Sequence, residues 1–550
     1  MEIVAEQAGA RVRLRFPYQA DAVQFVRRLP GREWDADSKT WFIPPGAVRE
    51  LRQWAARSGN ILRMSDTLAA SLDESSKRRQ RLLNLRRETD SPAFEISSST
   101  IPYPFQRAGI TYLLEALTGS SGGVLLADDM GLGKSFQALA AAVHTGAFPA
   151  LILCPAILKA NWALEIEKHF PDLSCVIVEG EKTKRDILWG DSTAKVVIAN
   201  YELLLRDVAP LARKWKLVIC DEAQRIKNAQ AVTTRRVKKL SRAHSLALTG
   251  TPIENRLEDL ASIMEFVQPG LLGDYWEFRR QHCVLNSWGS VIGYQGVDSV
   301  KERIAPYYLR RTKRQVLTQL PPKVYVDLEV LLSKDEHQAY IAIRDQILEF
   351  VKANPLLRAS NILALLTRLR QCVDSLALVG LGTASSKLIA FQEILEGAGE
   401  QQIVVFSSFR HMAELVAETA GGMALHGEIP SRRQEEILAA FHKREFQVLA
   451  CTDVLAYGRN LVSASIVVHV EPHWNPARMR QREDRLHRIG QENPVTVVNL
   501  LAKNTVDGYV RRVIQRKLSL LSDILGDDEQ AAMHLTRSEL VAFLEGGLDA

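Results

Sequence analysis

The stretch from Val124 to Gly146 constrains the fold of this chain more than any other. It begins with the apolar run 124–127, which predicts one buried strand, and it ends in apolar residues at helical spacing, with Gly146 as the helix cap. Between strand and helix stands the turn Gly131-Leu132-Gly133-Lys134-Ser135. A strand, a glycine-rich turn, a Lys-Ser pair and a helix are the parts of a phosphate-binding loop. The stretch therefore predicts a parallel α/β sheet that holds a phosphate.

One residue of this stretch departs from the strict phosphate-loop pattern G-x-x-x-x-G-K-[ST]. Asp128 stands where the pattern has its first glycine. In the phosphate interpretation, backbone N–H groups cradle the phosphates, Lys134 reaches the terminal ones and the Ser135 hydroxyl can ligate Mg²⁺. The alternative is an ordinary strand-to-helix turn, and the rest of the chain must decide between the two.

Composition limits the classes of protein to which the chain can belong. A chain of 550 residues is too long for one core, and 46% hydrophobic with 24% charged residues is typical of a globular protein. The net charge of +6 is compatible with a nucleic-acid partner. The six cysteines never form C-x-x-C, which excludes a sequence-local zinc knuckle and a disulfide framework. Without a signal peptide or an apolar run of membrane-spanning length, we expect an intracellular, reduced protein.

Two kinds of pattern predict the organisation of the chain. After Ile101, short apolar runs alternate with helical patterns, and this alternation occurs twice, as in two parallel α/β lobes. The predicted strands are 124–127, 151–154, 196–199, 217–220 and 246–248 in the first lobe, and 403–406, 448–451, 466–470 and 495–500 in the second. The predicted domains are a small α/β domain over 1–65, a basic connector over 66–100, the first lobe over 101–270, a helical insertion and linker over 271–384, the second lobe over 385–525 and a tail over 526–550.

Two basic runs have open interpretations. The connector carries six basic residues with no acid among them, namely Lys77, Arg78, Arg79, Arg81, Arg86 and Arg87. A solvated helix face and a phosphate contact explain this run equally well. The helical insertion carries a second basic patch at 310–314.

A pair of adjacent carboxylates follows the predicted strand 217–220. The carboxyl ends of parallel strands form the edge at which open α/β sheets bind ligands. There, Asp221 can hold Mg²⁺ through water, and Glu222 can orient or deprotonate an attacking water. A turn or a helix cap is the alternative for this pair alone. Together with Lys134 on the same sheet edge, however, the pair predicts an ATPase.

Two further stretches fit an ATPase. The strand that ends at Leu248 is followed by Thr249-Gly250-Thr251-Pro252, whose hydroxyls can relay the state of a γ-phosphate, although an ST-turn is the alternative. In the run 481–491, Arg485 and Arg488 lie three residues apart, so on a helix they would share one face. Guanidiniums that reach a nucleotide from a second lobe are arginine fingers, and a solvated basic helix is the alternative.

The order of these motifs resembles that of the Swi/Snf-type helicase-like ATPases of helicase superfamily two. The motifs that carry the resemblance are 103–107, 127–135, 154–156, 221–228, 248–252, 309–313, 474–476 and the phrase Asp-Arg-Leu-His-Arg-Ile-Gly-Gln over 484–491. The resemblance implies two RecA-like lobes and a monomeric motor that uses ATP and Mg²⁺ to move on double-stranded DNA. In this family an aspartate at the place of Asp128 is ordinary.

The resemblance also assigns site residues. It implies that nucleotide is bound by Gln106, Asp128, Asp129, Met130, Gly131, Leu132, Gly133, Lys134 and Ser135. Ser135 and Asp221 would hold the metal. Lys134, Glu222, Arg485 and Arg488 would act in catalysis.

Three features depart from the family pattern. Gln224 stands where the family has histidine in the Asp-Glu box, and we expect coupling between the lobes to survive because Gln can still hydrogen-bond. The segment Cys451–Leu461 replaces a glycine-rich stretch and keeps only Gly458, Asn460 and Leu461 of its tail. The chain shows no bromodomain-, chromodomain- or zinc-like addition.

The N-terminal domain has a resemblance of its own, to the HepA-related (HARP) domain of annealing helicases. It is carried by the stretches 16–18, 29–32, 34–35 and 39–42. The domain interleaves the basic residues Arg11, Arg13, Arg15, Arg32 and Lys39 with the aromatic residues Tyr18, Trp34 and Trp41. Such a mixture can grip a DNA backbone and stack on exposed bases. The alternative is that both tryptophans form the core of this small domain.

The leading interpretation is a DNA-dependent ATPase that translocates on duplex DNA and rewinds or remodels branched or partly melted structures. An RNA helicase is a second interpretation, suggested by Asp-Glu-Ala-Gln over 221–224. A third is a nucleotide-gated DNA-binding subunit that displaces or recruits partners. The intact Lys134, Glu222, Arg485 and Arg488 argue against this third, non-enzymatic interpretation.

Overall fold

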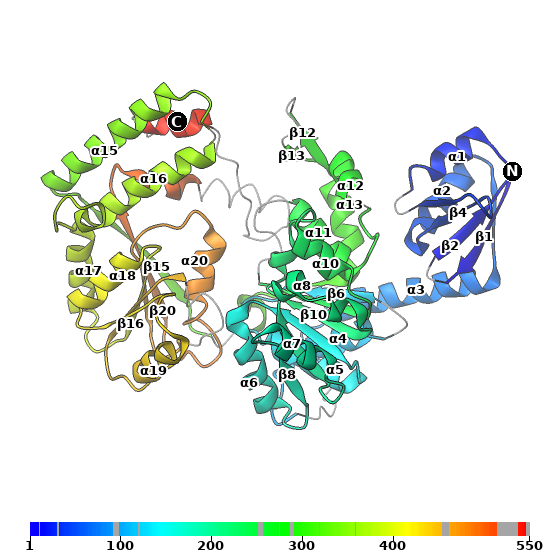
Figure 1. Ribbon diagram of the computed structural model, residues 1–550, viewed down its shortest axis with the longest axis horizontal. Helices are drawn as coiled ribbons and strands as arrows, with labels where there is room; N and C mark the ends of the chain where they lie inside the picture. Colours follow the sequence, from blue (N-terminus) through cyan, green and yellow to red (C-terminus); the bar gives the residue numbers. More distant parts are fainter. Residues whose placement is uncertain are drawn as a thin grey trace. The chain divides into compact units, whose positions relative to one another are not determined.

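The computed structural model describes residues 1–9, 11–29, 32–91, 98–118, 122–250, 257–273, 275–286, 291–317, 320–357, 359–453, 461–513 and 537–545. The chain divides into two compact units, which are described separately below (Figure 1). The first unit comprises Met1–Asp129 and Gly133–Thr312, and the second comprises Met130–Leu132 and Lys313–Ala550. Among the described residues, no helix is both long and apolar enough to cross a membrane.

The first unit begins with a small α/β domain built on a mixed five-stranded sheet of order β3-β4-β2-β1-β5. Its elements are β1 (Glu2–Ala8), β2 (Arg11–Arg15), α1 (Ala20–Val26), β3 (Glu33–Asp35), β4 (Thr40–Ile43), α2 (Val48–Arg57) and β5 (Ile61–Met64). Alternate residues of the central strands point inward, as the sequence pattern predicts, so that Ile3, Ala5, Val12 and Leu14 are fully buried. These side chains form the core of the domain.

A single helix, α3 (Asp66–Leu85), joins this domain to the rest of the first unit. Its first turn is capped by Ser65, and Leu68 belongs to the core of the N-terminal domain. Further along, Arg78 donates to the carbonyl oxygens of Glu115 (3.3 Å) and Ala116 (2.6 Å), the last two residues of α4 (Pro104–Ala116). Arg81 adds an ion pair of 2.8 Å with Glu115. Part of the basic run therefore caps a helix C-terminus, which is neither of the two interpretations of the sequence.

The main sheet of the first unit has seven parallel strands in the order β14-β6-β11-β10-β7-β9-β8. The strands are β6 (Gly122–Leu126), β7 (Ala150–Cys154), β8 (Cys175–Ile177), β9 (Val196–Asn200), β10 (Trp215–Asp221), β11 (Arg242–Leu248) and β14 (Tyr308–Leu309). The helices after α4 are α5 (Lys134–Thr145), α6 (Lys159–His169), α7 (Lys182–Gly190), α8 (Leu203–Arg206), α9 (Ala209–Ala212), α10 (Val232–Lys238), α11 (Leu257–Val267), α12 (Tyr275–His282) and α13 (Val297–Ile304). The strands β12 (Cys283–Leu285) and β13 (Val291–Tyr294) pair as a separate antiparallel ribbon.

The second unit has a six-stranded parallel sheet of order β15-β20-β19-β16-β18-β17. Its strands are β15 (Lys323–Val330), β16 (Ile403–Phe406), β17 (Met423–Leu425), β18 (Val448–Cys451), β19 (Ile466–His469) and β20 (Val495–Ala502). Its helices are α14 (Lys313–Val316), α15 (Lys334–Ala353), α16 (Ala359–Asp374), α17 (Ser386–Gly397), α18 (Arg410–Thr419), α19 (Ser431–His442), α20 (Pro476–Glu483) and α22 (Arg537–Leu544).

The predicted fold class, two parallel α/β lobes preceded by a small α/β domain, is confirmed. Every strand predicted from an apolar run is present, while β8, β14, β15 and β17 were not predicted. The stretch 271–384 contains helices, as predicted, but it also supplies β14 to the first sheet and β15 to the second. The strand β15 pairs with β20, more than 160 residues away, from Lys323 opposite Val495 onward. Pairing at such a distance leaves no local signal in the sequence.

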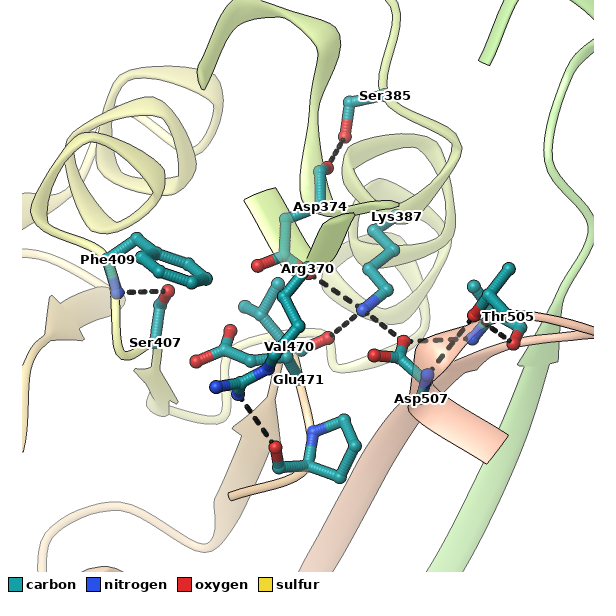
Figure 2. A network of polar contacts seen from close by, with 12 residues as sticks. Arg370, Asp374, Ser385, Lys387, Ser407, Phe409, Val470, Glu471, Thr505 and Asp507 are labelled. Carbon is teal, nitrogen blue, oxygen red and sulfur yellow. Dashed lines mark hydrogen bonds and ion pairs between the residues drawn. The ribbon is translucent and has the colours of Figure 1, made fainter. Parts of the chain in front are cut away.

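A buried ionic network lies inside the second unit (Figure 2). The Nζ atom of Lys387, at the start of α17, lies 2.8 Å from Oδ1 of Asp374 and 2.6 Å from Oδ2 of Asp507. It also donates to the carbonyl oxygen of Val470 over 2.7 Å. All three charged side chains are completely buried. The network thus ties α16 and α17 to the segment that leads from β19 into α20.

Candidate active site

The loop between β6 and α5 has the geometry of a phosphate loop. Gly131 and Gly133 adopt φ values of 84° and 75°, the left-handed region that glycine enters without strain. The Nζ atom of Lys134 donates to the carbonyl oxygens of Asp128 (2.6 Å) and Asp129 (3.2 Å), so it lies within the loop. Burial lowers the pKa of Lys134 below its usual value, against the opposing effect of Asp128. An ammonium held in this way is ready to exchange carbonyl partners for phosphate oxygens.

Gln106 borders this loop. Its Oε1 accepts a hydrogen bond of 3.0 Å from the backbone N–H of Tyr103, which fixes the side chain at the start of α4. A Cβ atom on Gly133 would lie 2.5 Å from Nε2 of Gln106, so only glycine fits at that point. The structure therefore brings Gln106 beside the phosphate loop.

Asp128, which replaces the first glycine of the strict pattern, holds a buried arginine. Its Oδ1 accepts hydrogen bonds of 3.0 Å from both the backbone N–H and the Nε of Arg311, and its Oδ2 pairs with Nη2. The same guanidinium donates to Gln137 on α5 over 2.8 Å and to the carbonyl oxygen of Phe105. A Cβ on Gly109 would clash with this network at 1.9 Å from Gln137. The carboxylate of Asp128 thus anchors the chain after β14, and a direct contact of this carboxylate with nucleotide stays a prediction.

Asp221 ends β10 in a half-buried position. Its Oδ2 accepts from the indole N–H of Trp162 (2.8 Å) and its Oδ1 from the backbone N–H of Glu222 (2.9 Å). Tyr201 donates to its carbonyl oxygen over 2.7 Å. Burial, followed by repulsion from Glu222, raises the pKa of Asp221 to about 7. A cation beside this carboxylate would relieve both effects.

Glu222 stands in a backbone conformation that non-glycine residues rarely adopt, with φ 50° and ψ 55°. The side chain of Gln224 links it to the next strand. Nε2 of Gln224 donates to Oε2 of Glu222 (2.7 Å), and Oγ1 of Thr249 donates to Oε1 of Gln224 (2.8 Å). A hydrogen-bonded chain therefore joins the end of β10 to the end of β11. The remaining residues of the predicted relay, 251–255, lie outside the described residues.

The predicted metal ligands suit Mg²⁺ better than a metal that protein side chains bind entirely. Within the described ranges, no group of three or more His, Cys, Asp and Glu side chains could hold a metal ion. Mg²⁺ needs no such cage, because it is usually held by one or two protein oxygens, waters and the phosphates of a nucleotide. Ser135, in the first turn of α5, and the half-buried Asp221 supply oxygens of that kind.

In the second unit, Arg485 and Arg488 follow α20 and do not lie on it. The helix ends at Glu483, and residues Asp484–Arg488 form what we call the arginine turn. The prediction that the two arginines share a helix face is therefore wrong. Leu486 between them is completely buried in one core of the second unit. Arg485 is nearly buried and Arg488 is partly exposed.

Two lysines, the buried Lys313 and the half-buried Lys323, hold the acidic start of the arginine turn. Nζ of Lys313 lies 2.8 Å from Oδ1 of Asp484, and Nζ of Lys323 lies 3.0 Å from the same oxygen. Lys323 also pairs with Glu483 over 2.9 Å. Burial opposes the ionised forms, but the two lysines lower the pKa of Asp484 well below its usual range. Because Arg311 and Lys313 are both buried in ion pairs, the stretch 310–314 is no exposed basic patch.

The N-terminal domain buries some of its aromatic side chains and exposes others. Trp41 packs against the domain core. The alternative in which the tryptophans serve the core therefore holds for at least one of the two. Trp34 packs against Trp41 in a tilted arrangement with ring centroids 5.0 Å apart and is 47% exposed. Arg11 and Arg15 on the sheet are paired with glutamates Glu33 and Glu6, which reduces their net charge. The exposed aromatic surface of the domain therefore lies at Trp34 and at Tyr18, which is 86% exposed.

Sequence reasoning missed the contribution of Trp162. Its indole is completely buried and orients the carboxylate of Asp221. A signal did exist. Trp162 is in the first turn of α6, the helix that follows β7, and β7 lies beside β10 in the sheet. An indole there reaches the carboxyl end of the neighbouring strand.

The fold and this edge of the sheet define a two-lobed α/β protein with a phosphate loop and a paired-carboxylate box. Comparison with protein families agrees with that class: residues 105–378 match the SNF2-related domain and residues 386–490 match the helicase conserved C-terminal domain. The chain belongs to the SNF2-related family of ATP-dependent helicases. The resemblance to the Swi/Snf-type ATPases inferred from the motifs is thereby confirmed. Both matched family models lie at residue 105 or beyond, so the HARP resemblance of the N-terminal domain stays a prediction.

Relatives share this family. An uncharacterized ATP-dependent helicase of Mycoplasma genitalium is 30% identical over 80% of this chain and 44% of its own length. The putative ATP-dependent helicase/translocase YwqA of Bacillus subtilis is 28% identical over 94% of this chain and 59% of its own length. The chain thus spans about half the length of these curated relatives. A solved Sulfolobus solfataricus SWI2/SNF2 ATPase core in complex with dsDNA is 29% identical, covers 79% of this chain and 95% of that chain, and has a TM-score of 0.41.

Proposed function

We propose that the protein is a DNA-dependent ATPase that translocates on double-stranded DNA. The observation that carries this proposal is the order β6-β11-β10 in the first sheet. These three adjacent strands end in the phosphate loop, in Thr249 and in the Asp221-Glu222 pair, so three ATPase elements share one sheet edge. Ligands of open α/β sheets bind at this edge. Family membership supports the same activity.

Each residue has a role in this proposal. The backbone of 128–133 and Lys134 bind the phosphates of ATP, with Gln106 beside them. Ser135 and Asp221 would hold Mg²⁺, which would supply positive charge to the phosphate oxygens. Glu222 accepts a proton from the attacking water, and its link to Gln224 holds the carboxylate in place. Arg485 and Arg488 stabilise charge on the transferring phosphoryl group.

One assay tests the proposal. ATP hydrolysis is measured without nucleic acid and with duplex DNA, single strands, forked DNA and RNA, each at matched nucleotide concentration. We expect the largest stimulation with duplex or forked DNA. Stimulation by RNA alone would support the RNA-helicase interpretation, and hydrolysis that no nucleic acid stimulates would support a nucleotide-gated binding subunit.

We further propose that the N-terminal domain directs the motor to junctions of paired and unpaired strands. The support is the exposed aromatic side chains of Trp34 and Tyr18, in the same domain as the exposed basic residues Arg32 and Lys39. Aromatic faces stack on unpaired bases, while basic side chains contact the phosphates. The branched-DNA and rewinding activities of this proposal depend on that surface.

The variant Arg32→Ala with Lys39→Ala should weaken binding to forked DNA and the rewinding of a partly melted duplex. Loss of two phosphate contacts should reduce the slope of log affinity against log salt by roughly one to two. Rewinding is normalised to the duplex-stimulated ATPase rate, which should not change. The matched control is Arg11→Ala with Arg15→Ala, which removes the same charge from residues already paired with glutamates. Equal rewinding by both double variants and the unaltered chain would remove the N-terminal domain from the proposal.

A further inference from the structure

The segment Cys451–Leu461, in which this chain departs from the family pattern, contacts the arginine turn and its helix from both of its described ends. At one end, Asp453 follows β18 and pairs with arginines of α20. At the other end, the backbone N–H of Leu461 donates to the carbonyl oxygen of Arg485 over 2.9 Å. Residues 454–460 lie outside the described residues. Described residues on either side of this segment thus contact α20 and the arginine turn.

The two carboxylate oxygens of Asp453 bind different arginines. Oδ1 lies 2.8 Å from Nε and 2.6 Å from Nη2 of Arg482, and Oδ2 lies 2.8 Å from Nη1 of Arg478. Burial alone would raise the pKa of Asp453, but the adjacent guanidinium of Arg482 lowers it below its usual value. Asp453 is therefore ionised at neutral pH, and its charge is shared by two side chains of one helix.

Of the two arginines, Arg482 is the one that links Asp453 to the arginine turn. Its side chain is completely buried, and its guanidinium lies over the ring of Phe406 with 5.3 Å to the centroid. A guanidinium stays charged in proteins, so one that is buried requires a counter-charge. The carbonyl oxygen of Arg482 accepts the backbone N–H of Arg485 over 3.2 Å. A shift of Arg482 would therefore move the start of the arginine turn directly.

We propose that Asp453 is a positioning residue for Arg485: it fixes the last turn of α20 through Arg482, so that the arginine turn presents its guanidiniums in a catalytically useful place. Lys313 and Lys323 hold the start of the turn through Glu483 and Asp484, and Asp453 holds the preceding turn of α20 through Arg482. This inference rests on the proposed function, because the role of Arg485 in hydrolysis is part of that proposal.

The test is a double-variant cycle in the full chain, with turnover measured at saturating duplex DNA and nucleotide affinity measured separately. Asp453→Asn keeps the shape of the side chain and removes its charge. We expect kcat to fall about tenfold or more, with the Kd for ATP unchanged within about threefold, because misplacement of a transition-state group affects turnover and not binding. The double variant Asp453→Asn with Arg485→Ala should be no slower than Arg485→Ala alone, since the first change acts through the second residue.

The matched control is Glu436→Gln, which neutralises an exposed carboxylate paired with Arg433 on α19 and should leave turnover unchanged. If Asp453→Asn does not fold, Asp453→Glu keeps the charge, displaces it by one methylene and should show the same non-additivity. Effects of the two single variants that multiply would overturn the positioning role and leave the proposed function standing. An unchanged turnover of Arg485→Ala would instead overturn the assigned role of Arg485 and the inference with it.

Discussion

Lys134→Ala and Glu222→Gln should each reduce DNA-stimulated ATP turnover by a factor on the order of a hundred or more. Lys134 supplies the only side-chain cation of the phosphate loop, and alanine leaves the terminal phosphates without it. Glu222→Gln retains an oxygen that can accept the hydrogen bond from Gln224, so the fold of the box should survive. The amide cannot accept a proton from water, so ATP should remain bound and uncleaved.

The measurements separate binding from hydrolysis. Steady-state turnover with duplex DNA is compared with the affinity for a fluorescent nucleotide analogue. We expect Lys134→Ala to weaken both, and Glu222→Gln to lose turnover alone. Lys182→Ala and Glu181→Gln are the matched controls, because both side chains are exposed at the start of α7. Near-normal turnover in either active-site variant would contradict the assignment of this edge of the sheet as the active site.

The second large effect concerns stability. Lys387→Met should destabilise the second unit by about 3–5 kcal/mol, because it leaves the completely buried carboxylates of Asp374 and Asp507 without their cation. Met fills a similar volume, so the loss of charge dominates over any cavity. The free energy of unfolding is followed through the denaturant transition of the second unit.

Two further variants test this explanation. Lys352→Met removes an exposed lysine paired with Glu545 and should cost less than about 1 kcal/mol. Adding Asp374→Asn to Lys387→Met should restore part of the lost stability, because one of the two uncompensated carboxylates becomes neutral. A Lys387→Met protein as stable as the unaltered chain would show that the network in Figure 2 contributes conformational specificity and little stability.

The sequence predicted what depends on local pattern. The strands β16 and β18 begin and end where their apolar runs do, because all four residues of each are buried on both faces of a parallel sheet. The phosphate loop was predictable for a similar reason, since its turn, lysine and helix are contiguous. Gly146 ends α5 in the left-handed conformation, as predicted.

What the sequence did not predict depends on partners far along the chain. The strand β15 is an edge strand with several exposed apolar residues, and its partner β20 comes more than 160 positions later. The helical prediction for Arg485 failed where α20 ends, next to the buried Leu486 and to ion pairs with the distant lysines at 313 and 323. The ion pair between Asp128 and Arg311 spans 183 positions. The fold therefore explains in physical terms why an aspartate stands where the strict pattern has its first glycine.

The continuous helix α3 has a mechanical consequence. Its first turn is part of the core of the N-terminal domain, and Arg78 and Arg81 fasten its second half to α4. Twenty helical residues span about 30 Å, close to one turn of duplex DNA, and unlike a flexible tether they transmit torque. If the first unit moves on duplex DNA as proposed, a domain carried on such an arm keeps a constant phase around the DNA axis relative to the lobe that bears it. Each advance of that lobe along the DNA groove would then carry the exposed Trp34 through the same helical step.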